Sequence, residues 1–145
     1  MKRTMQIVEL KEVTAQQMAD LTGLMKELSE RVTMTEEALL NVLKDDNSHL
    51  FALMAEGGVV GCATLCVFHS PTGRKASVED VVVSSICRGR HWGRALMERM
   101  LEEAQKLAPI EVQLTSKPKR VAANALYQSL GFQRKETNCY RLVLN

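Results

Sequence analysis

Three arginines and two glycines lie close together in the middle of the chain, where residues 88–94 read Arg-Gly-Arg-His-Trp-Gly-Arg. An apolar, β-branched run at residues 81–83 precedes them and predicts a buried strand. Apolar side chains then recur at helical spacing, which predicts an amphipathic helix over residues 94–107. A helix that begins directly after such a turn presents unpaired N–H groups, which bind anions such as pyrophosphate. By itself, the pattern fits a tight turn with solvated arginines equally well.

Two adjacent acids, Glu79 and Asp80, lie inside the predicted central strand, residues 76–84. Successive side chains of a strand point to opposite faces, so one acid is expected to face the substrate side and the other a helix layer. An acid in so apolar a strand is costly to bury without a partner. The alternative to a chemical role for Glu79 is an ion pair with Lys75 or an arginine.

A second segment follows about thirty residues later, where residues 123–132 read Ala-Asn-Ala-Leu-Tyr-Gln-Ser-Leu-Gly-Phe. It predicts a helix over residues 119–130 that Gly131 ends. Together, the two segments resemble the GNAT superfamily of acetyl-CoA-dependent N-acetyltransferases, over roughly residues 50–144. That family has an Arg/Gln-x-x-Gly-x-Gly/Ala turn before a helix, and later an Ala-x-x-Leu-Tyr-x-x-x-Gly-Phe segment. If Gly93 ends the turn, His91 replaces the first glycine of the pattern; in the less favoured alternative, residues 90–95 fit Arg-x-x-Gly-x-Ala.

The resemblance implies a site for acetyl-CoA, used as cosubstrate without a metal, between the central strand, the turn and the second segment. Tyr127 would protonate the departing thiolate, unless it only packs its helix, and Glu79 would act as general base, directly or through water. Asn124 would contact the cofactor, unless it is a solvated helix residue. The residues implied in cofactor binding are Val81, Val82, Val83, Arg88, Gly89, Arg90, His91, Trp92, Gly93, Arg94, Ala95, Asn124 and Tyr127.

Three functions are compatible with these motifs. The first is acetyl transfer to a primary amine of a small molecule such as an amino sugar, aminophosphonate, amino acid or polyamine. The second is acetylation of a protein N-terminus or lysine, which needs an open groove for a peptide. The third is an acyl-CoA-binding sensor module without catalysis, against which Tyr127 and Glu79 count weakly.

Length, composition and charge limit the classes of protein to which the chain can belong. The chain has 145 residues, enough for a single domain over residues 1–145, and 46% of them are apolar, as in a folded protein. A net charge of +2 is too small to favour nucleic acid as a partner. The sequence has neither an apolar run long enough for a membrane nor a signal peptide, so a cytoplasmic protein is expected. Of the four cysteines, Cys62, Cys66, Cys87 and Cys139, the first two lack a second pair at zinc-site spacing and are expected to be reduced and buried. Cys87 is expected to be a structural thiol.

The order of the predicted elements indicates an α+β fold, with a mixed, mostly antiparallel sheet and helices on both faces. Further strands are predicted over residues 7–10, 50–55, 59–68, 110–115 and 137–144, and helices begin at Ala15 and after Thr35. By resemblance, the central strand and the strand after the long helix splay apart around acetyl-CoA. The closing strand, residues 137–144, would lie near a sheet edge that needs cover, which predicts a homodimer. The substrate pocket is expected from residues 28–35, the loop 69–75 and the closing strand near Asn138 and Tyr140.

Overall fold

The computed structural model describes residues 4–145 and divides the chain into two compact units, Met1–Leu114 and Thr115–Asn145. The first unit contains the elements β1 (Gln6–Leu10), α1 (Ala15–Leu28), α2 (Glu36–Lys44), β2 (Ser48–Ala55), β3 (Gly58–Ser70), β4 (Gly73–Val83), the 3-10 helix η1 (Ser85–Cys87), α3 (Trp92–Gln105) and β5 (Glu111–Gln113). The second unit contains α4 (Val121–Ser129).

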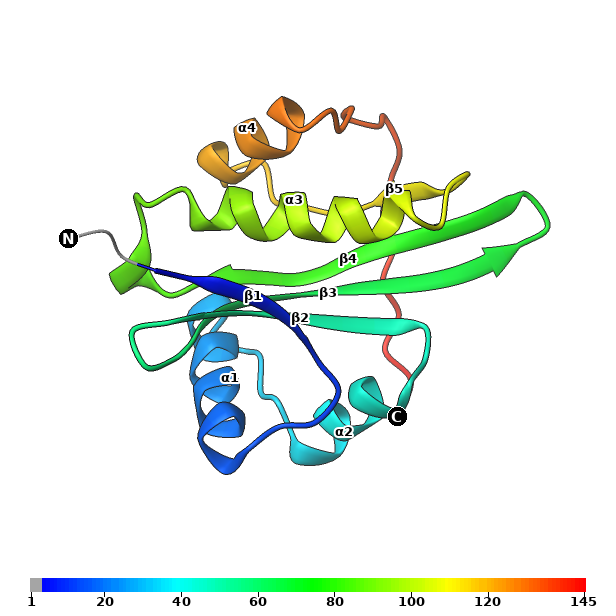
Figure 1. Ribbon diagram of the computed structural model, residues 1–145. Coiled ribbons are helices and arrows are strands. Elements are labelled where there is room, and N and C mark those ends of the chain that lie inside the picture. The colour runs from blue at the N-terminus through cyan, green and yellow to red at the C-terminus, as the bar shows by residue number, and fades with distance from the viewer. Residues whose placement is uncertain (1–3) are drawn as a thin grey trace. The chain divides into compact units, whose positions relative to one another are not determined.

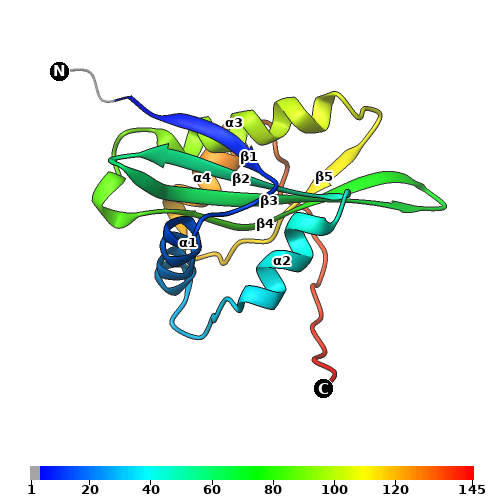
Figure 2. The same ribbon diagram turned by 60° about the horizontal axis from the view of Figure 1, so that its bottom comes forward.

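The first unit is built on one five-stranded sheet in the order β1-β2-β3-β4-β5. Its first four strands are antiparallel, and β5 joins β4 in parallel after the α3 crossover. Helices α1 and α2 cover one face of this sheet, and α3 lies on the other (Figures 1 and 2). The predicted fold class, a mixed and mostly antiparallel sheet with helices on both faces, is therefore confirmed.

Thr14 and Thr35 cap the first two helices. Thr14 forms a capping box with Gln17: its hydroxyl accepts from the Gln17 N–H at 3.1 Å, and its own N–H donates to the Gln17 side chain at 2.9 Å. Thr35 accepts from the Ala38 N–H at 3.1 Å, and Glu36 follows it in the first turn of α2. These local contacts explain why both helix starts could be predicted from the sequence.

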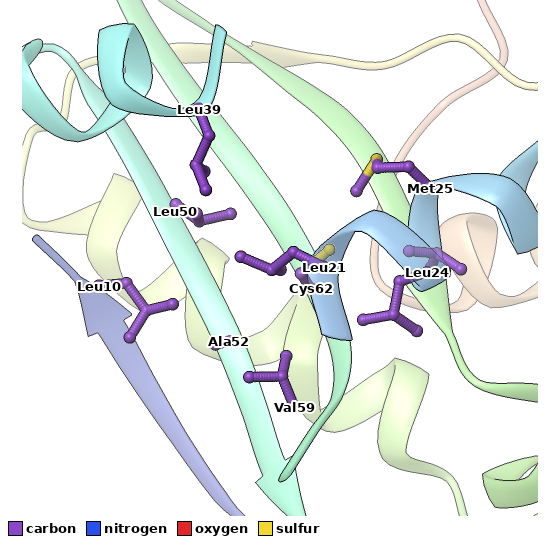
Figure 3. Close-up of a cluster of buried hydrophobic side chains, with 10 residues drawn as sticks. Leu10, Leu21, Leu24, Met25, Leu39, Leu50, Ala52, Val59 and Cys62 are labelled. Atoms are coloured by element: carbon purple, nitrogen blue, oxygen red, sulfur yellow. The ribbon is translucent and has the colours of Figure 1, made fainter. Parts of the chain in front are cut away.

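The core of the first unit lies on both faces of the sheet. Figure 3 shows Leu21 and Leu24 of α1, with Leu39 of α2, directed at the strands that they cover. On the opposite face, α3 contributes the fully buried side chains of Leu96, Met97 and Met100. Burial was predicted for Cys62 and Cys66, and it is confirmed for Cys62. Cys62 and Cys87 are buried, Cys66 is half-buried and Cys139 is exposed.

Residues 69–75 form a hairpin where the sequence predicted a polar loop. β3 runs to Ser70 and β4 begins at Gly73, so that His69 lies opposite Arg74 in the ladder and only Pro71 and Thr72 remain in the turn. The strands were not predicted here because the side chains are polar, and backbone pairing along a long hairpin does not require apolar residues on both faces.

The second unit contains α4 and, after it, no further strand within residues 130–145. The predicted closing strand over residues 137–144 is therefore wrong. Alternation supplies a side-chain pattern, but a strand also needs a neighbour for its backbone N–H and C=O groups. Tyr140, Leu142 and Leu144 are instead 87%, 83% and 85% exposed.

Candidate active site

A β-bulge in β4 changes the faces on which the two adjacent acids lie. Thr64 pairs with Glu79 and Cys62 pairs with Val82, so two residues of β4 stand where β3 has one. The extra residue is accommodated at Asp80, whose φ of 52° is left-handed. Since Thr64 and Cys62 share one face of β3, Glu79 shares the face of Val82, which packs in the cluster beneath α1. The regular alternation of faces along β4 is therefore interrupted at Asp80.

Glu79 accepts a local hydrogen bond at this bulge, whereas the pKa of Asp80 is shifted. The Ser77 hydroxyl donates to Glu79 Oε1 at 2.6 Å, and within residues 4–145 Glu79 forms no ion pair with Lys75 or an arginine. Partial burial of the Asp80 carboxyl, and secondarily the negative charge of Glu79, raise the pKa of Asp80. Asp80 was not predicted as a site residue, because its left-handed position in a bulge has no sequence signal.

The thiol of Cys62 lies close to this acidic strand but is not a nucleophile. Burial, with a smaller contribution from the charge of Asp80, raises the pKa of Cys62 to about 12. A thiol with so high a pKa stays protonated near neutral pH, and only the thiolate is an effective nucleophile. Its role is to fill space beneath α1.

β4 leaves part of one edge unpaired next to the bulge. β5 pairs only with Lys75, Ala76 and Ser77 of β4, so residues 78–83 have no partner strand on that side in the described part of the chain. This edge includes the predicted binding residues Val81, Val82 and Val83. An extended ligand with amide groups can hydrogen-bond to such an edge as an added strand would.

The turn after η1 contains two left-handed residues. Gly89 has a φ of 82° and His91 has φ 60° and ψ 23°. His91 is the N-cap residue of α3, and its carbonyl accepts from the Ala95 N–H at 3.2 Å. Left-handed conformations favour glycine, so His91 occupies a glycine-like position, as expected in the register where Gly93 ends the turn.

The start of α3 is suited to an anion. No side chain caps its first N–H groups, and its first turn carries no acidic residue. A Cβ added at Gly93 would meet only Val83 Cγ2, at the ordinary contact distance of 3.9 Å. Packing therefore does not require glycine at this position, and its small size leaves open space beside the helix start.

Two of the three arginines near this turn, Arg90 and Arg94, are held by carboxylates. Arg90 Nη1 lies 2.8 Å from Glu56 Oε1, and its guanidinium lies 4.8 Å from the centre of the Trp92 ring. Arg94 Nε lies 2.8 Å from Glu98 Oε1 within α3. These contacts orient the arginine side chains and reduce the net positive charge that the sequence suggested for the turn.

The first residue of η1 is also bound by an acid. Glu27 Oε1 of α1 accepts from the Ser85 N–H at 2.9 Å. This hydrogen bond, the nearby hydroxyls of Ser85 and Ser84, and the charge of Arg88 lower the pKa of Glu27. Sequence reasoning missed both Glu27 and Glu56, because neither belongs to a motif and each lies far along the chain from its partner.

A groove of about 470 Å³ lies between α1, the β2–β3 turn and η1. Glu27, Glu56 and Ile86 are among its lining residues, whereas the segments expected to form a substrate pocket, residues 28–35 and 69–75, do not line it. No group of three or more His, Cys, Asp or Glu side chains suited to a metal ion exists among residues 4–145. Over the same residues, no helix combines the length and hydropathy needed to span a membrane.

Tyr127 and Asn124 belong to the second unit, whereas β4, the turn and α3 belong to the first. Tyr127 is buried, which raises the pKa of its phenol against a smaller opposing effect of Arg120, and its ring meets Phe132 edge-on. The Asn124 side-chain amide donates to the Lys117 carbonyl at 2.9 Å. Both residues therefore have structural contacts within their own unit.

Comparisons with known proteins agree with this architecture. The profile of the acetyltransferase (GNAT) family matches residues 14–132. No curated protein sequence matches the chain significantly. Similar solved structures include an aminoglycoside acetyltransferase from an uncultured soil metagenomic sample, with 18% identity, 97% of each chain covered and a TM-score of 0.83. An aminoglycoside N-acetyltransferase in complex with CoA has 19% identity, covers 99% of this chain and 97% of its own, and has a TM-score of 0.77. Glucosamine-6-phosphate N-acetyltransferase from Arabidopsis thaliana has 18% identity, covers 96% and 98%, and has a TM-score of 0.76.

Proposed function

Because the chain belongs to the GNAT family of acetyltransferases, we propose that it transfers the acetyl group of acetyl-CoA to a primary amine of a small molecule. The turn before α3 carries this proposal. Its glycine-like His91, the uncapped start of α3 and the open space at Gly93 together make a site for the pyrophosphate of the cosubstrate. Protein amines would require a peptide groove, whereas the amines named for similar structures belong to aminoglycosides and an amino sugar phosphate.

The unpaired edge of β4 supports binding of the pantetheine arm. Amide groups of that arm can pair with the backbone of residues 81–83, as a short added strand would. A backbone N–H there would also polarise the thioester carbonyl and stabilise the oxyanion that forms on attack. Because direct attack by the amine needs no enzyme nucleophile, the protonated thiol of Cys62 is compatible with this reaction.

Glu79 is the proposed general base, acting directly or through one water molecule. Its carboxylate forms no ion pair within residues 4–145 and is held by the Ser77 hydroxyl at 2.6 Å. Asp80 adds a second negative charge at the bulge. The two neighbouring carboxylates would attract an ammonium substrate, and Glu79 would accept the proton that the amine loses before or during attack.

Tyr127 is the proposed general acid for the departing thiolate. A general acid must carry its proton, and burial raises the pKa of Tyr127, which keeps the phenol protonated near neutral pH. Asn124 is proposed to contact the cofactor through its side-chain oxygen, while its amide nitrogen holds the Lys117 carbonyl.

The function is tested in two steps. Calorimetry should first detect binding of acetyl-CoA to the protein, and a thiol-release assay should then detect turnover with members of a panel of amino sugars, aminophosphonates, amino acids and polyamines. Absence of acetyl-CoA binding contradicts the proposal. Binding without turnover on any amine would favour a sensor module, and turnover only with peptides would favour a protein acetyltransferase.

We further propose that the protein works as a cytoplasmic homodimer. The dimer is supported by the exposed apolar side chains of residues 140–144, which need cover although they form no strand in the single chain. The cytoplasmic location rests on the sequence pattern alone.

A further inference from the structure

A residue far away in the sequence holds the start of η1, which leads into the turn before α3. Glu27 lies in the last turn of α1, and its Oε1 accepts from the N–H of Ser85, 58 residues later, at 2.9 Å. Ser85 is the first residue of η1, and the residue before it, Ser84, makes no side-chain cap hydrogen bond. Glu27 therefore occupies the role that a local capping residue would have.

The Glu27 carboxylate also interacts electrostatically with Arg88, at the other end of η1. The Ser85 N–H, the hydroxyls of Ser84 and Ser85 and the positive charge of Arg88 all favour the ionised form of Glu27. Arg88 is the C-cap residue of η1 and directly precedes the left-handed Gly89. One side chain of α1 thus acts on both ends of the short helix that leads into the turn.

The turn needs such support, because its conformation is not favoured locally. His91 holds a left-handed φ of 60° without the freedom of glycine. A residue in this region persists when its surroundings fix it. On the preceding side, the Ser84 N–H donates to the Val60 carbonyl at 2.7 Å, and on the following side Glu56 binds Arg90.

We propose that Glu27 is a positioning residue that sets the affinity for acetyl-CoA by holding η1 and the following turn in the binding conformation. The proposal rests on the proposed function, since it takes this turn as the pyrophosphate site. Glu27 acts through the backbone of Ser85 and has no role at the reacting atoms. Its loss should therefore raise the dissociation constant and the KM for acetyl-CoA while kcat at saturating cosubstrate changes little.

Electrostatics alone predicts the opposite change in acetyl-CoA affinity, so the two explanations can be distinguished by experiment. Glu27 is a negative charge close to an anion site, so removal of that charge alone would strengthen the binding of acetyl-CoA. Glu27→Ala and Glu27→Gln remove the same charge, but only Gln keeps an oxygen that can accept from the Ser85 N–H. A difference between the two variants therefore reports on the hydrogen bond and not on the charge.

The experiment measures acetyl-CoA binding by calorimetry and amide hydrogen exchange over residues 85–93, in the wild type, Glu27→Ala, Glu27→Gln and the control Glu30→Ala, which changes an exposed acid just after α1. In Glu27→Ala we expect affinity to fall about threefold to tenfold, the range for one lost hydrogen bond, and exchange at Ser85 to accelerate. Glu27→Gln and Glu30→Ala should stay within about twofold of wild type, since they keep or do not involve this contact.

Two results would overturn the positioning role: equal or tighter binding of acetyl-CoA in Glu27→Ala, or weaker binding without accelerated exchange at Ser85. A wild-type protein that fails to bind acetyl-CoA would instead refute the proposed function, and the exchange data would still show whether Glu27 holds the turn. Thermal unfolding of each variant identifies a general loss of folding, and Glu27→Gln then remains the decisive comparison with wild type.

Discussion

Phe132 and Tyr127 contact each other through backbone and side chain at the C-terminus of α4. The Phe132 N–H donates to the Tyr127 carbonyl at 3.1 Å, and the two rings meet edge-on with centres 6.1 Å apart. The Gly131 N–H donates to the Gln128 carbonyl at 3.1 Å, and Gly131 has a left-handed φ of 101°. These contacts are those of a Schellman motif with its hydrophobic pair. The Tyr-x-x-x-Gly-Phe spacing is therefore a helix ending, which fixes Tyr127 whatever its chemical role.

Tyr127→Phe separates the structural role of this residue from its proposed role as the acid. The ring contact and the helix ending are kept, so the free energy of unfolding should change little. Loss of the hydroxyl should lower kcat by roughly 10²–10⁴-fold with a small change in KM. Steady-state kinetics with a working amine checks this, and turnover within about threefold of wild type would assign the proton to water or to the ammonium product. Tyr127→Ala, as a contrast, should cost about 3–5 kcal/mol of stability.

Replacement of His91 by glycine should be tolerated, although it alters the proposed cofactor turn. A left-handed conformation costs a residue with a Cβ roughly 1–2 kcal/mol, and glycine removes that cost at an entropic penalty of about 0.5–1 kcal/mol. Urea unfolding should therefore show equal or slightly greater stability for His91→Gly. His69→Gly is the matched control, because His69 is an exposed residue of strand β3, where glycine should destabilise. A clear loss of stability in His91→Gly would contradict the glycine-like assignment.

Gly93 should be needed for binding and not for folding. Its added Cβ would make one ordinary contact at 3.9 Å, so Gly93→Ala should unfold within about 0.5 kcal/mol of wild type, as substitutions without a steric mechanism do. Acetyl-CoA affinity should fall, and it should fall much further in Gly93→Asp because a negative charge then faces the pyrophosphate.

Gly61→Ala is the contrasting variant, because here packing does require glycine. A Cβ at Gly61 would lie 3.1 Å from the Val82 carbonyl oxygen, so this variant should lose stability. Calorimetry and urea unfolding of the three glycine variants test both expectations, and an unchanged affinity in Gly93→Asp would remove the turn as the cofactor site.

Asp80 should make the stability of the protein depend on pH. Because its pKa is raised in the folded state, the folded protein holds this proton more tightly than the unfolded chain. The ionisation of Asp80 therefore opposes folding, and this cost grows as pH rises from the ordinary value of 3.8 through the raised pKa. Asp80→Asn should be more stable than wild type at pH 7 and lose that advantage near pH 3, as measured by urea unfolding at a series of pH values. Greater stability of wild type at pH 7 would contradict this sign.

The exposed apolar side chains of residues 140–144 should be required for formation of the proposed homodimer. Light scattering of the wild type at micromolar concentration should give twice the mass of one chain. The double substitution Leu142→Asp and Leu144→Asp should shift the protein to monomer, because charges would replace side chains that are 83% and 85% exposed in the single chain. Leu40→Asp, on α2, is the control and should leave the mass unchanged. A monomeric wild type would contradict the proposed homodimer.

The elements that could be predicted from the sequence are those whose causes are local. Thr14 and Thr35 cap helices within three residues of themselves, and Gly131 ends α4 through contacts to the preceding turn. The family motifs around Gly93 and Tyr127 were also readable, because each is one short segment with fixed spacing. The same locality explains the error over residues 137–144, where a regular side-chain pattern has no partner strand to complete it.

The details of the site could not be predicted from the sequence, because they depend on pairs of residues that lie far apart in the chain and meet only in the folded protein. The bulge at Asp80 follows from the register of β4 against Cys62 and Thr64 of β3, and it moves Glu79 onto the face of Val82. The contacts of Glu27 with Ser85 and of Glu56 with Arg90 arise from packing of α1 and the β2–β3 turn near η1. A carboxylate carries no sequence mark of its distant partner, so its function becomes visible only once folding has brought the two groups together.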